Sequence, residues 1–234
     1  MKIGTVVRNI PRSSSNQLQE LAIAGVATVH EAMGRVGLMQ PYMRPVYHGA
    51  PIAGNAVTAL VHPGDNWMIH VAVECCQPGD VLVVAVSAEN GDGMFGDLLA
   101  TSLKAHGVAA LIIDAGVRDV ADLRAMQFPV WSRCISAKGT IKATLGNVNT
   151  PVICAGAIVR GGDVVVADDD GIVVVPYEDV ETTIAASQQR LAREAIKRER
   201  LAAGELGLDI ESMRPTLEQL GLKYYDTLKD IDLN

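Results

Sequence analysis

The sequence predicts an α/β fold with a largely parallel sheet, followed by a helical C-terminal extension. Apolar runs alternate with helical patterns between residues 81 and 134, which is typical of βαβ units. Short apolar runs separated by Gly- and Asp-rich turns follow between residues 151 and 175, as in a β-meander. From residue 178 the chain is rich in Ala, Arg, Glu and Gln, which favours one long helix.

The N-terminal part predicts a helix, a strand and a second helix. Residues 13–20 have the polar composition of a capped helix start, and apolar positions extend that helix to about residue 32. After a loop containing Pro and Gly, residues 52–61 alternate loosely and predict a strand. A His-Pro-Gly sequence ends this strand, and Asp65 is expected to cap a helix over residues 66–74.

The central segment predicts three buried strands separated by helices. The strands are short apolar runs, expected over residues 81–86, 108–113 and 129–134. A Gly-rich loop over residues 90–96 leads into a helix over 97–106. A short helix is expected from Asp119 to Met126, which completes the strand-helix alternation.

The pattern changes after Gly139. Three β runs are expected over residues 151–159, 164–167 and 172–175, with Gly- and Asp-containing turns between them. One long helix is then expected from residue 178 to about 203, followed by a polar tail. We therefore expect one α/β domain over residues 1–177 and a helical extension over residues 178–234.

Composition excludes several classes of function. Of 234 residues, 20 are Lys or Arg and 27 are Asp or Glu, so the formal net charge is -7, which argues against nucleic-acid and anionic-membrane partners. Aromatic residues make up only 4%, too few for a base-stacking platform. No apolar run is long enough to span a bilayer, and the first residues lack the apolar segment of a secretory signal. Four cysteines without metal-site spacing indicate reduced thiols in a cytoplasmic protein.

A Gly-rich segment is the first candidate site. Gly91 to Gly96 read as G-x-G-x-x-G between a strand and a helix, with Asp114 near the position of a ribose-binding acid. Residues 87–90 nevertheless separate the strand from the first glycine, so the tight turn of a dinucleotide site is lost. In a second interpretation, the glycines have no ligand and only shape a surface loop. In a third interpretation, Gly96 lets a small anion reach the free N–H groups at the start of the following helix.

Arg118 and Asp119 are the second candidate site. They follow a buried strand and Gly116, at the edge where open α/β sheets bind ligands. Arg118 offers a planar fork to a carboxylate, and Asp119 offers a hard oxygen ligand to a divalent metal. The alternative is structural, with Asp119 as the N-cap of the next helix and Arg118 exposed to solvent.

Three other features favour structural interpretations. The run Asp168–Asp170 with Gly171 resembles a metal cluster, but it is more typical of a turn between two strands. His70 has helical spacing from Trp67 and is expected to pack. Lys138 lies in a polar loop without the apolar pocket that a Schiff-base lysine needs.

Together, these motifs make the family recognisable. Gly96-Asp97-Leu98, followed after a long spacing by Arg118-Asp119, resembles the signature of the RraA-like family, and within it the class II pyruvate aldolases. The resemblance runs over nearly the whole chain. The other segments that carry it are residues 29–32, 63–68, 78–84, 164–171 and 201–207.

The resemblance implies a "swivelling" β/β/α-type domain that assembles as homotrimers or homohexamers with sites between subunits. It implies an aldolase of aromatic-compound degradation. Such an enzyme cleaves 4-hydroxy-4-methyl-2-oxoglutarate or 4-carboxy-4-hydroxy-2-oxoadipate to pyruvate plus pyruvate or oxaloacetate. Oxaloacetate decarboxylation is a plausible side activity, because it passes through the same pyruvate enolate.

The resemblance also implies roles for individual residues. Asp119 is expected to bind Mg²⁺ or Mn²⁺, with waters completing the coordination. Arg118 is expected to hold the substrate carboxylate or the enolate oxygen. Gly96 and the backbone N–H groups of Leu98 and Leu99 complete the cradle. Asp97 is expected to hold the water that shuttles protons, and Glu194 of a neighbouring subunit's C-terminal helix is expected to assist.

A second class of function stays open, because the same family includes a non-enzymatic regulator that binds an RNA-degrading enzyme. The C-terminal segment, residues 178–234, favours the aldolase, since it can supply site residues between subunits that a minimal regulator would lack.

Overall fold

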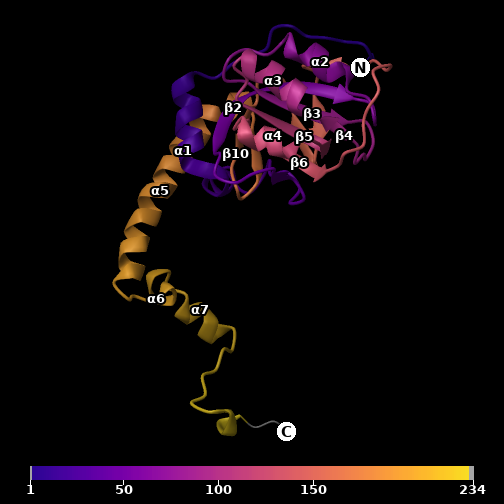
Figure 1. Ribbon diagram of the computed structural model, residues 1–234. Helices are drawn as coiled ribbons and strands as arrows, with labels where there is room; N and C mark the ends of the chain where they lie inside the picture. Colours follow the sequence, from indigo (N-terminus) through magenta and orange to yellow (C-terminus); the bar gives the residue numbers. More distant parts are fainter. Residues whose placement is uncertain (1, 232–234) are drawn as a thin grey trace. The chain divides into compact units, whose positions relative to one another are not determined.

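A nine-stranded mixed sheet is the centre of residues 1–188 in the computed structural model, which describes residues 2–231 (Figure 1). The strands run in the order β1-β6-β5-β3-β2-β10-β11, with β4 beside β5 and β7 beside β2. The bounds of these strands are β1 Arg44–Pro45, β2 Ile52–Val61, β3 Val81–Val86, β4 Gly93–Phe95, β5 Ala110–Val117, β6 Val130–Ile135, β7 Asn147–Val148, β10 Val164–Ala167 and β11 Ile172–Val175. The pairs β2–β3, β3–β5, β4–β5 and β5–β6 are parallel. The predicted α/β fold is therefore confirmed.

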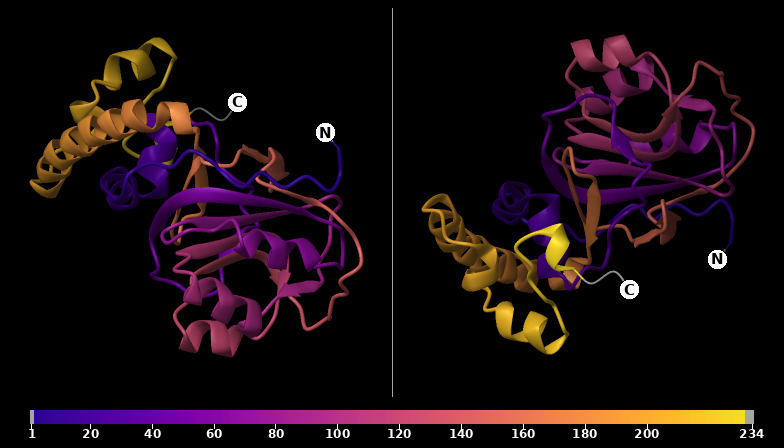
Figure 2. Two further views of the ribbon diagram at one scale, coloured as in Figure 1. Left: turned by 90° about the horizontal axis from the view of Figure 1, so that it is seen from above. Right: turned by 90° about the horizontal axis from the view of Figure 1, so that it is seen from below.

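Both faces of this sheet are buried. Helices α2 (Trp67–Val73), α3 (Asp97–Ala105) and α4 (Val120–Ala125) cover one face (Figures 1 and 2). The hairpin β8–β9 (Val152–Cys154 and Ala157–Val159) packs on the other. Successive strand residues point to opposite faces, so the alternate residues of β3 and β5 enter two different cores. Burial on both sides explains why these strands are continuous apolar runs in the sequence.

The first helix, α1 (Ser15–Ala32), begins as the sequence predicts but bends in the middle. Ser14 and Gln17 form a capping box at its start. Gly25 has a φ of 76° and breaks the helical backbone there. The helix resumes at Val26, whose N–H donates to Asp168 Oδ2 at 2.8 Å. The kink therefore needs both a glycine and a carboxylate from the β10–β11 turn.

Two predicted boundaries near the candidate site are wrong. The strand expected over residues 108–113 continues as β5 to Val117, and Gly116 lies inside it rather than turning the chain. The loop expected over residues 90–96 contains β4, which pairs in parallel with the end of β5. A Cβ at Gly116 would lie 2.5 Å from the Gly91 carbonyl oxygen. The glycine is therefore required by the close approach of these two strands.

The C-terminal segment is helical, as expected. A short 3-10 turn, η1 (Tyr177–Asp179), leads into α5 (Val180–Ala202). The second unit of the chain begins at Gln189, inside α5. It continues with α6 (Gly207–Ile210), α7 (Arg214–Gln219) and η2 (Leu228–Asp230). Within this unit, the ion pair between Lys197 and Glu211 joins α5 to the residue after α6.

Two further features bear on the expected class of protein. None of the helices within residues 2–231 is long and apolar enough to cross a membrane. Within the same residues the four cysteines are free thiols, with Cys75 and Cys154 buried. Burial raises the pKa of the Cys76 thiol to about 12. The Cys76 thiol is therefore protonated and unreactive at neutral pH.

Candidate functional site

The parallel pair β4–β5 brings the two candidate motifs together. Phe95 is paired with Val117, so Gly96 and Arg118 follow at the same edge of the sheet. The Arg118 N–H donates to the Phe95 carbonyl at 2.9 Å and fixes this register. The carboxyl ends of parallel strands meet at one edge. The long spacing between the motifs is therefore the length of chain that forms α3 and β5.

Gly96 is required by the close approach of Asp119. A Cβ at residue 96 would lie 2.2 Å from Asp119 Oδ2 and 3.1 Å from Arg118 Nε. The backbone of Gly96 is extended, with a φ of -156°, so any residue could adopt it. The glycine therefore serves to leave room for the carboxylate, and the two motifs form one site.

Asp119 occupies the N-cap position of α4, but its side chain does not cap that helix. The carboxylate is turned toward α3, where Oδ2 accepts the Asp97 N–H at 3.2 Å and lies 3.4 Å from Arg118 Nε. The backbone of Asp119 is left-handed, with a φ of 56°, which is strained for most residues and clusters at functional sites. This geometry therefore does not support the alternative in which the Asp119 side chain caps α4.

The start of α3 supplies backbone donors beside this carboxylate. The first helical hydrogen bond runs from the Ala100 N–H to the Gly96 carbonyl. The N–H groups of Leu98 and Leu99 precede it and have no partner within the helix. The Leu98 side chain is 76% exposed, so it does not close the site. The helix start can therefore accept an anionic group.

A cavity of about 90 Å³ lies at this helix start, which is room for a few water molecules or a small acid. Its lining residues come from α2, β4, α3, the end of β5 and the loop after β6: Asn66, His70, Gly93, Met94, Phe95, Gly96, Asp97, Leu98, Leu99, Arg118 and Lys142. Every predicted substrate-binding residue of the resemblance lines it. The cavity is therefore the centre of the candidate site.

Three polar lining residues, Asn66, His70 and Lys142, lie outside both predicted site motifs. His70 was expected to pack, but it is exposed and faces the cavity region. Partial desolvation of the ring by its neighbours, together with the charge of Lys142, lowers the pKa of His70. Asn66 is buried and its Nδ2 donates to the Met94 carbonyl at 3.0 Å, whereas its Oδ1 has no hydrogen-bond partner within residues 2–231. No local pattern marks these residues, because they reach the site through tertiary structure.

The structure gives the Gly-rich segment a role without a nucleotide. A Cβ at Gly93 would lie 2.2 Å from the Ser136 carbonyl oxygen. Gly93 therefore packs against the loop after β6, and its N–H donates to the backbone carbonyl of Lys138 at 2.8 Å. With β4 inside the motif, the tight strand-to-helix turn of a dinucleotide site does not form. The glycines instead allow backbones to approach one another.

The other conspicuous residues are held in structural contacts. Asp168 accepts the N–H groups of Val26 and Asp170, at 2.8 and 2.9 Å. Asp169 accepts the Gly49 N–H at 3.0 Å. Lys138 is 71% exposed and forms an ion pair with Asp92 at 2.9 Å. The turn and the loop therefore have the structural roles that their sequences favour.

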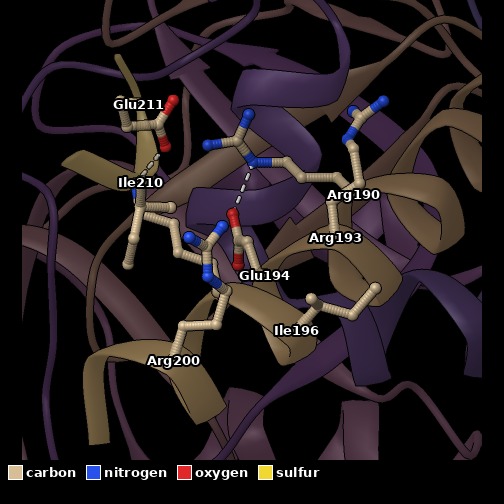
Figure 3. Close-up of a pocket in the computed structure, with 8 residues that line it drawn as sticks. Arg190, Arg193, Glu194, Ile196, Arg200, Ile210 and Glu211 are labelled. Carbon is tan, nitrogen blue, oxygen red and sulfur yellow. Dashed lines mark hydrogen bonds and ion pairs between the residues drawn. The ribbon is translucent and has the colours of Figure 1, made fainter. Parts of the chain in front are cut away.

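Glu194 was expected to assist proton transfer from a neighbouring subunit. It lies in the second unit of the chain. Its Oε1 is 2.8 Å from Arg190 Nε, one helical turn away on α5 (Figure 3). It lines a hollow of about 370 Å³ together with Arg190, Arg193, Ile196, Lys197, Arg200, Ile210 and Glu211. The carboxylate is about one third exposed, so it is accessible in one chain. Its role in catalysis stays a prediction.

The donor set suits a divalent cation that keeps most of its water. No group of three or more His, Cys, Asp or Glu side chains that could hold a metal ion occurs within residues 2–231. The contacts of the Asp119 carboxylate with Asp97 and Arg118 both use Oδ2, and the side chain is 31% exposed. One carboxylate with open space beside it fits Mg²⁺ or Mn²⁺, which bind through few protein ligands and water.

Comparisons with known proteins point to one family. A family model described as RraA-like, Aldolase/RraA, matches residues 26–174. A Halalkalibacterium halodurans protein named "Putative 4-hydroxy-4-methyl-2-oxoglutarate aldolase" is 27% identical over 164 residues, 70% of this chain and 78% of that one. A Burkholderia multivorans protein of the same name is 31% identical over 156 residues, 65% of this chain and 94% of that one.

A solved structure shows the same fold. Streptomyces coelicolor RraAS2, described as an unusual member of the RNase ES inhibitor RraA protein family, superposes with a TM-score of 0.71. It is 27% identical, and the match covers 81% of this chain and 99% of that one. The family model spans the helix, strand and turn residues that build the cavity, and it includes both motifs. This chain therefore belongs to the RraA-like family.

Proposed function

We propose that this protein is a divalent-metal-dependent lyase that cleaves 4-hydroxy-2-oxo dicarboxylic or tricarboxylic acids and releases pyruvate. The proposed substrates are 4-hydroxy-4-methyl-2-oxoglutarate, a dicarboxylate, and 4-carboxy-4-hydroxy-2-oxoadipate, a tricarboxylate. The observation that carries the proposal is the Asp119 carboxylate. It sits at the start of α3 beside Arg118, in a left-handed backbone, and does not cap its own helix. Related proteins named as aldolases support it.

Substrate binding uses the helix start and the guanidinium group. The C1 carboxylate accepts hydrogen bonds from the Leu98 and Leu99 N–H groups, which the helix dipole favours. Arg118, 44% exposed beside the cavity, donates to the C1 carboxylate or to the C2 oxygen. These donors are fixed by β4, β5 and α3, so they need little reorganisation as charge develops.

Bond cleavage places charge on the C2 oxygen. The C4 hydroxyl loses its proton, the C3–C4 bond breaks, and the electron pair becomes the enolate of pyruvate. When bound at Asp119, Mg²⁺ or Mn²⁺ polarises the 2-oxo group and stabilises this charge. Arg118 stabilises the same oxygen, and Asp97 is positioned to hold a water that moves the proton. Protonation at C3 then releases pyruvate, and the same enolate accounts for a possible oxaloacetate decarboxylase activity.

The direct test is pyruvate release from both substrates, coupled to lactate dehydrogenase. We expect turnover that a chelator abolishes and that added Mg²⁺ or Mn²⁺ restores. Treatment with borohydride in the presence of pyruvate should leave no covalent adduct, because the proposed mechanism forms no Schiff base with a lysine. A trapped adduct, or turnover that persists in chelator, would contradict the metal-dependent mechanism.

We propose that the site is completed in a homotrimer or homohexamer, with Glu194 of a neighbouring subunit near the proton-carrying water. Ile196, Leu201 and Leu206 are 62%, 43% and 56% exposed, and several exposed apolar side chains in one short segment favour a partner surface. Light scattering should show a trimer or hexamer. A fully active monomer would contradict this proposal.

A ribonuclease regulator is the second candidate function. Its support is the likeness to RraAS2, at 27% identity over 81% of this chain. A regulator would inhibit RNA cleavage by an RNase ES-type enzyme without releasing pyruvate. Inhibition by Asp119→Asn equal to that by the unchanged protein would indicate a surface activity independent of the cavity. Absence of inhibition would rule out this second candidate function.

A further inference from the structure

The cavity has a second cationic side chain whose position depends on a buried carboxylate. Asp65 is only 1% exposed. Its Oδ1 accepts the Trp67 N–H at 2.9 Å, and its Oδ2 accepts the N–H groups of Ala143 and Thr144, both at 2.7 Å. One side chain therefore ties the start of α2 to the loop that carries Lys142.

Backbone bonds complete this connection. The Ile141 N–H donates to the Gly64 carbonyl at 2.9 Å, and the Asn66 N–H donates to the Ile141 carbonyl at 3.1 Å. Burial alone acts to raise the pKa of Asp65, but the hydrogen bonds from Trp67 and the loop outweigh it and lower the pKa. The carboxylate is therefore ionised at neutral pH and accepts strong, charge-assisted hydrogen bonds.

The result is that Lys142 reaches the cavity. It lines the space together with Arg118 and the start of α3. Lys138, in the same loop, is neutralised by Asp92, whereas no ion pair of Lys142 occurs within residues 2–231. Its charge is also close enough to His70 to lower the pKa of that histidine. The cavity therefore offers two cations, one of which lies 3.4 Å from Asp119.

We propose that Lys142 binds the second carboxylate of the substrate, and that Asp65 is the positioning residue that holds Lys142 there. The inference rests on the proposed function, because it assumes that the first carboxylate is bound by the start of α3 and Arg118. Lys142 then sets the preference for dicarboxylic over monocarboxylic 2-oxo acids. Lys is suited to this task because it acts as a point charge that does not require one carboxylate geometry.

The test is a binding measurement that does not depend on turnover. Isothermal titration calorimetry in Mg²⁺ compares 2-oxoglutarate with 2-oxopentanoate, in which a methyl group replaces the second carboxylate. Lys142→Met keeps the length of the side chain and removes the charge. We expect it to weaken 2-oxoglutarate binding by about 10- to 100-fold more than 2-oxopentanoate binding, because a hydrogen bond between charged groups is lost. Lys104→Met, an exposed lysine on α3, is the matched control.

Asp65 is tested through its dependence on Lys142. Asp65→Asn keeps the shape of the side chain but loses one acceptor and the charge, so we expect the same loss of selectivity. Combined with Lys142→Met it should cause no further loss, because residues that act through one another are not additive. A purely structural role for Asp65 would give additive losses with both ligands. If Asp65→Asn does not fold, the Lys142→Met result decides alone.

The outcomes separate this inference from the proposed function. No preference for 2-oxoglutarate in the unchanged protein, or equal losses for both ligands in Lys142→Met, would overturn the assignment of Lys142. Pyruvate release from 4-hydroxy-4-methyl-2-oxoglutarate is measured in parallel. If it fails while the selectivity follows Lys142, the catalytic proposal is wrong and the dicarboxylate site stands.

Discussion

Asp119 and the run Asp168–Asp170 are both acidic segments that follow a strand, yet their oxygens are used differently. In the β10–β11 turn, Asp168 accepts two backbone N–H groups and holds the kink of α1, and Asp169 accepts a third. Asp119 accepts one N–H at 3.2 Å, through a single oxygen, although it stands at the N-cap of α4. The acidic run resembles a metal site but is structural, whereas the carboxylate at the apparent cap position is turned toward the start of α3 and lies beside Arg118.

This difference shows that a metal site cannot be identified from the number of neighbouring carboxylates alone. A carboxylate whose acceptor positions are filled by backbone N–H groups loses charge-assisted hydrogen bonds when it turns to a cation. A carboxylate that accepts only one long hydrogen bond, on a residue with a strained backbone, loses much less hydrogen-bond energy when it binds a cation. This comparison predicts which substitutions affect activity and which affect stability.

The largest effect is expected for Asp119→Asn. Asn tolerates the left-handed backbone, so the fold should survive, but a neutral amide is a poor ligand for a divalent cation. We expect kcat/KM for pyruvate release to fall by about 10²- to 10³-fold, as when one preorganised stabilising group is lost. Steady-state kinetics with circular dichroism measure both properties. A near-unchanged kcat/KM would remove Asp119 from the site.

A smaller loss of activity is expected for Gly96→Ala. The extended backbone accepts Ala, but the added Cβ would lie 2.2 Å from Asp119 Oδ2. The carboxylate must move, so we expect kcat to fall by about 10-fold or more, since small displacements of site groups are costly. Gly139→Ala is the matched control, because its Cβ meets only Arg118 Nη1, at 3.9 Å. Equal activity of the two variants would show that residue 96 does not set the position of Asp119.

The opposite result is expected for Asp168→Asn. The amide can replace only one of two acceptor oxygens, so one N–H at the α1 kink or in the turn loses its partner. We expect a loss of about 1–3 kcal/mol of unfolding free energy, with kcat/KM changed less than about twofold. Urea unfolding and the pyruvate assay test this pair of outcomes. A variant with unchanged stability and much lower activity would reverse the comparison.

A change of stability with pH is expected from Asp65. Its pKa is lowered in the folded protein, so the unfolded state binds more protons near the usual Asp pKa of about 3.9. The stabilisation by Asp65 is therefore complete above that pH and is lost as pH falls through the lower pKa of the folded state. The gap in Tm between the unchanged protein and Asp65→Asn should be largest at pH 7 and shrink toward about pH 3. A Tm difference that does not depend on pH would contradict the stabilisation of the fold by an ionised Asp65 carboxylate.

Local patterns predicted much of the fold. The strand over residues 52–61, the buried strand over 81–86 and the capped helix start within residues 13–20 agree with the structure, because each depends on neighbouring residues. The extension of β5 through Gly116 and the strand β4 were missed. Both depend on pairing between segments far apart in the sequence, and the glycines that allow this pairing look like loop residues when read alone.

The site was predicted in part for the same reason. Gly96, Asp97 and the Arg118-Asp119 pair are recognisable as motifs. The structure brings Gly96, Asp97 and Arg118 to one cavity, with the Asp119 carboxylate beside Arg118. Lys142 and Asn66 carry no local signal. They reach the cavity because Asp65 joins two loops through backbone N–H groups, and no periodicity in the sequence reports such a clamp.

The proposed mechanism requires that Asp119, and not the run Asp168–Asp170, binds the catalytic cation. Electron paramagnetic resonance of Mn²⁺ titrated into the unchanged protein, Asp119→Asn and Asp168→Asn tests it most directly. We predict a bound Mn²⁺ signal, displaced by Mg²⁺, that is lost in Asp119→Asn and kept in Asp168→Asn. Mn²⁺ binding that survives Asp119→Asn, or that is lost in Asp168→Asn, would contradict the account.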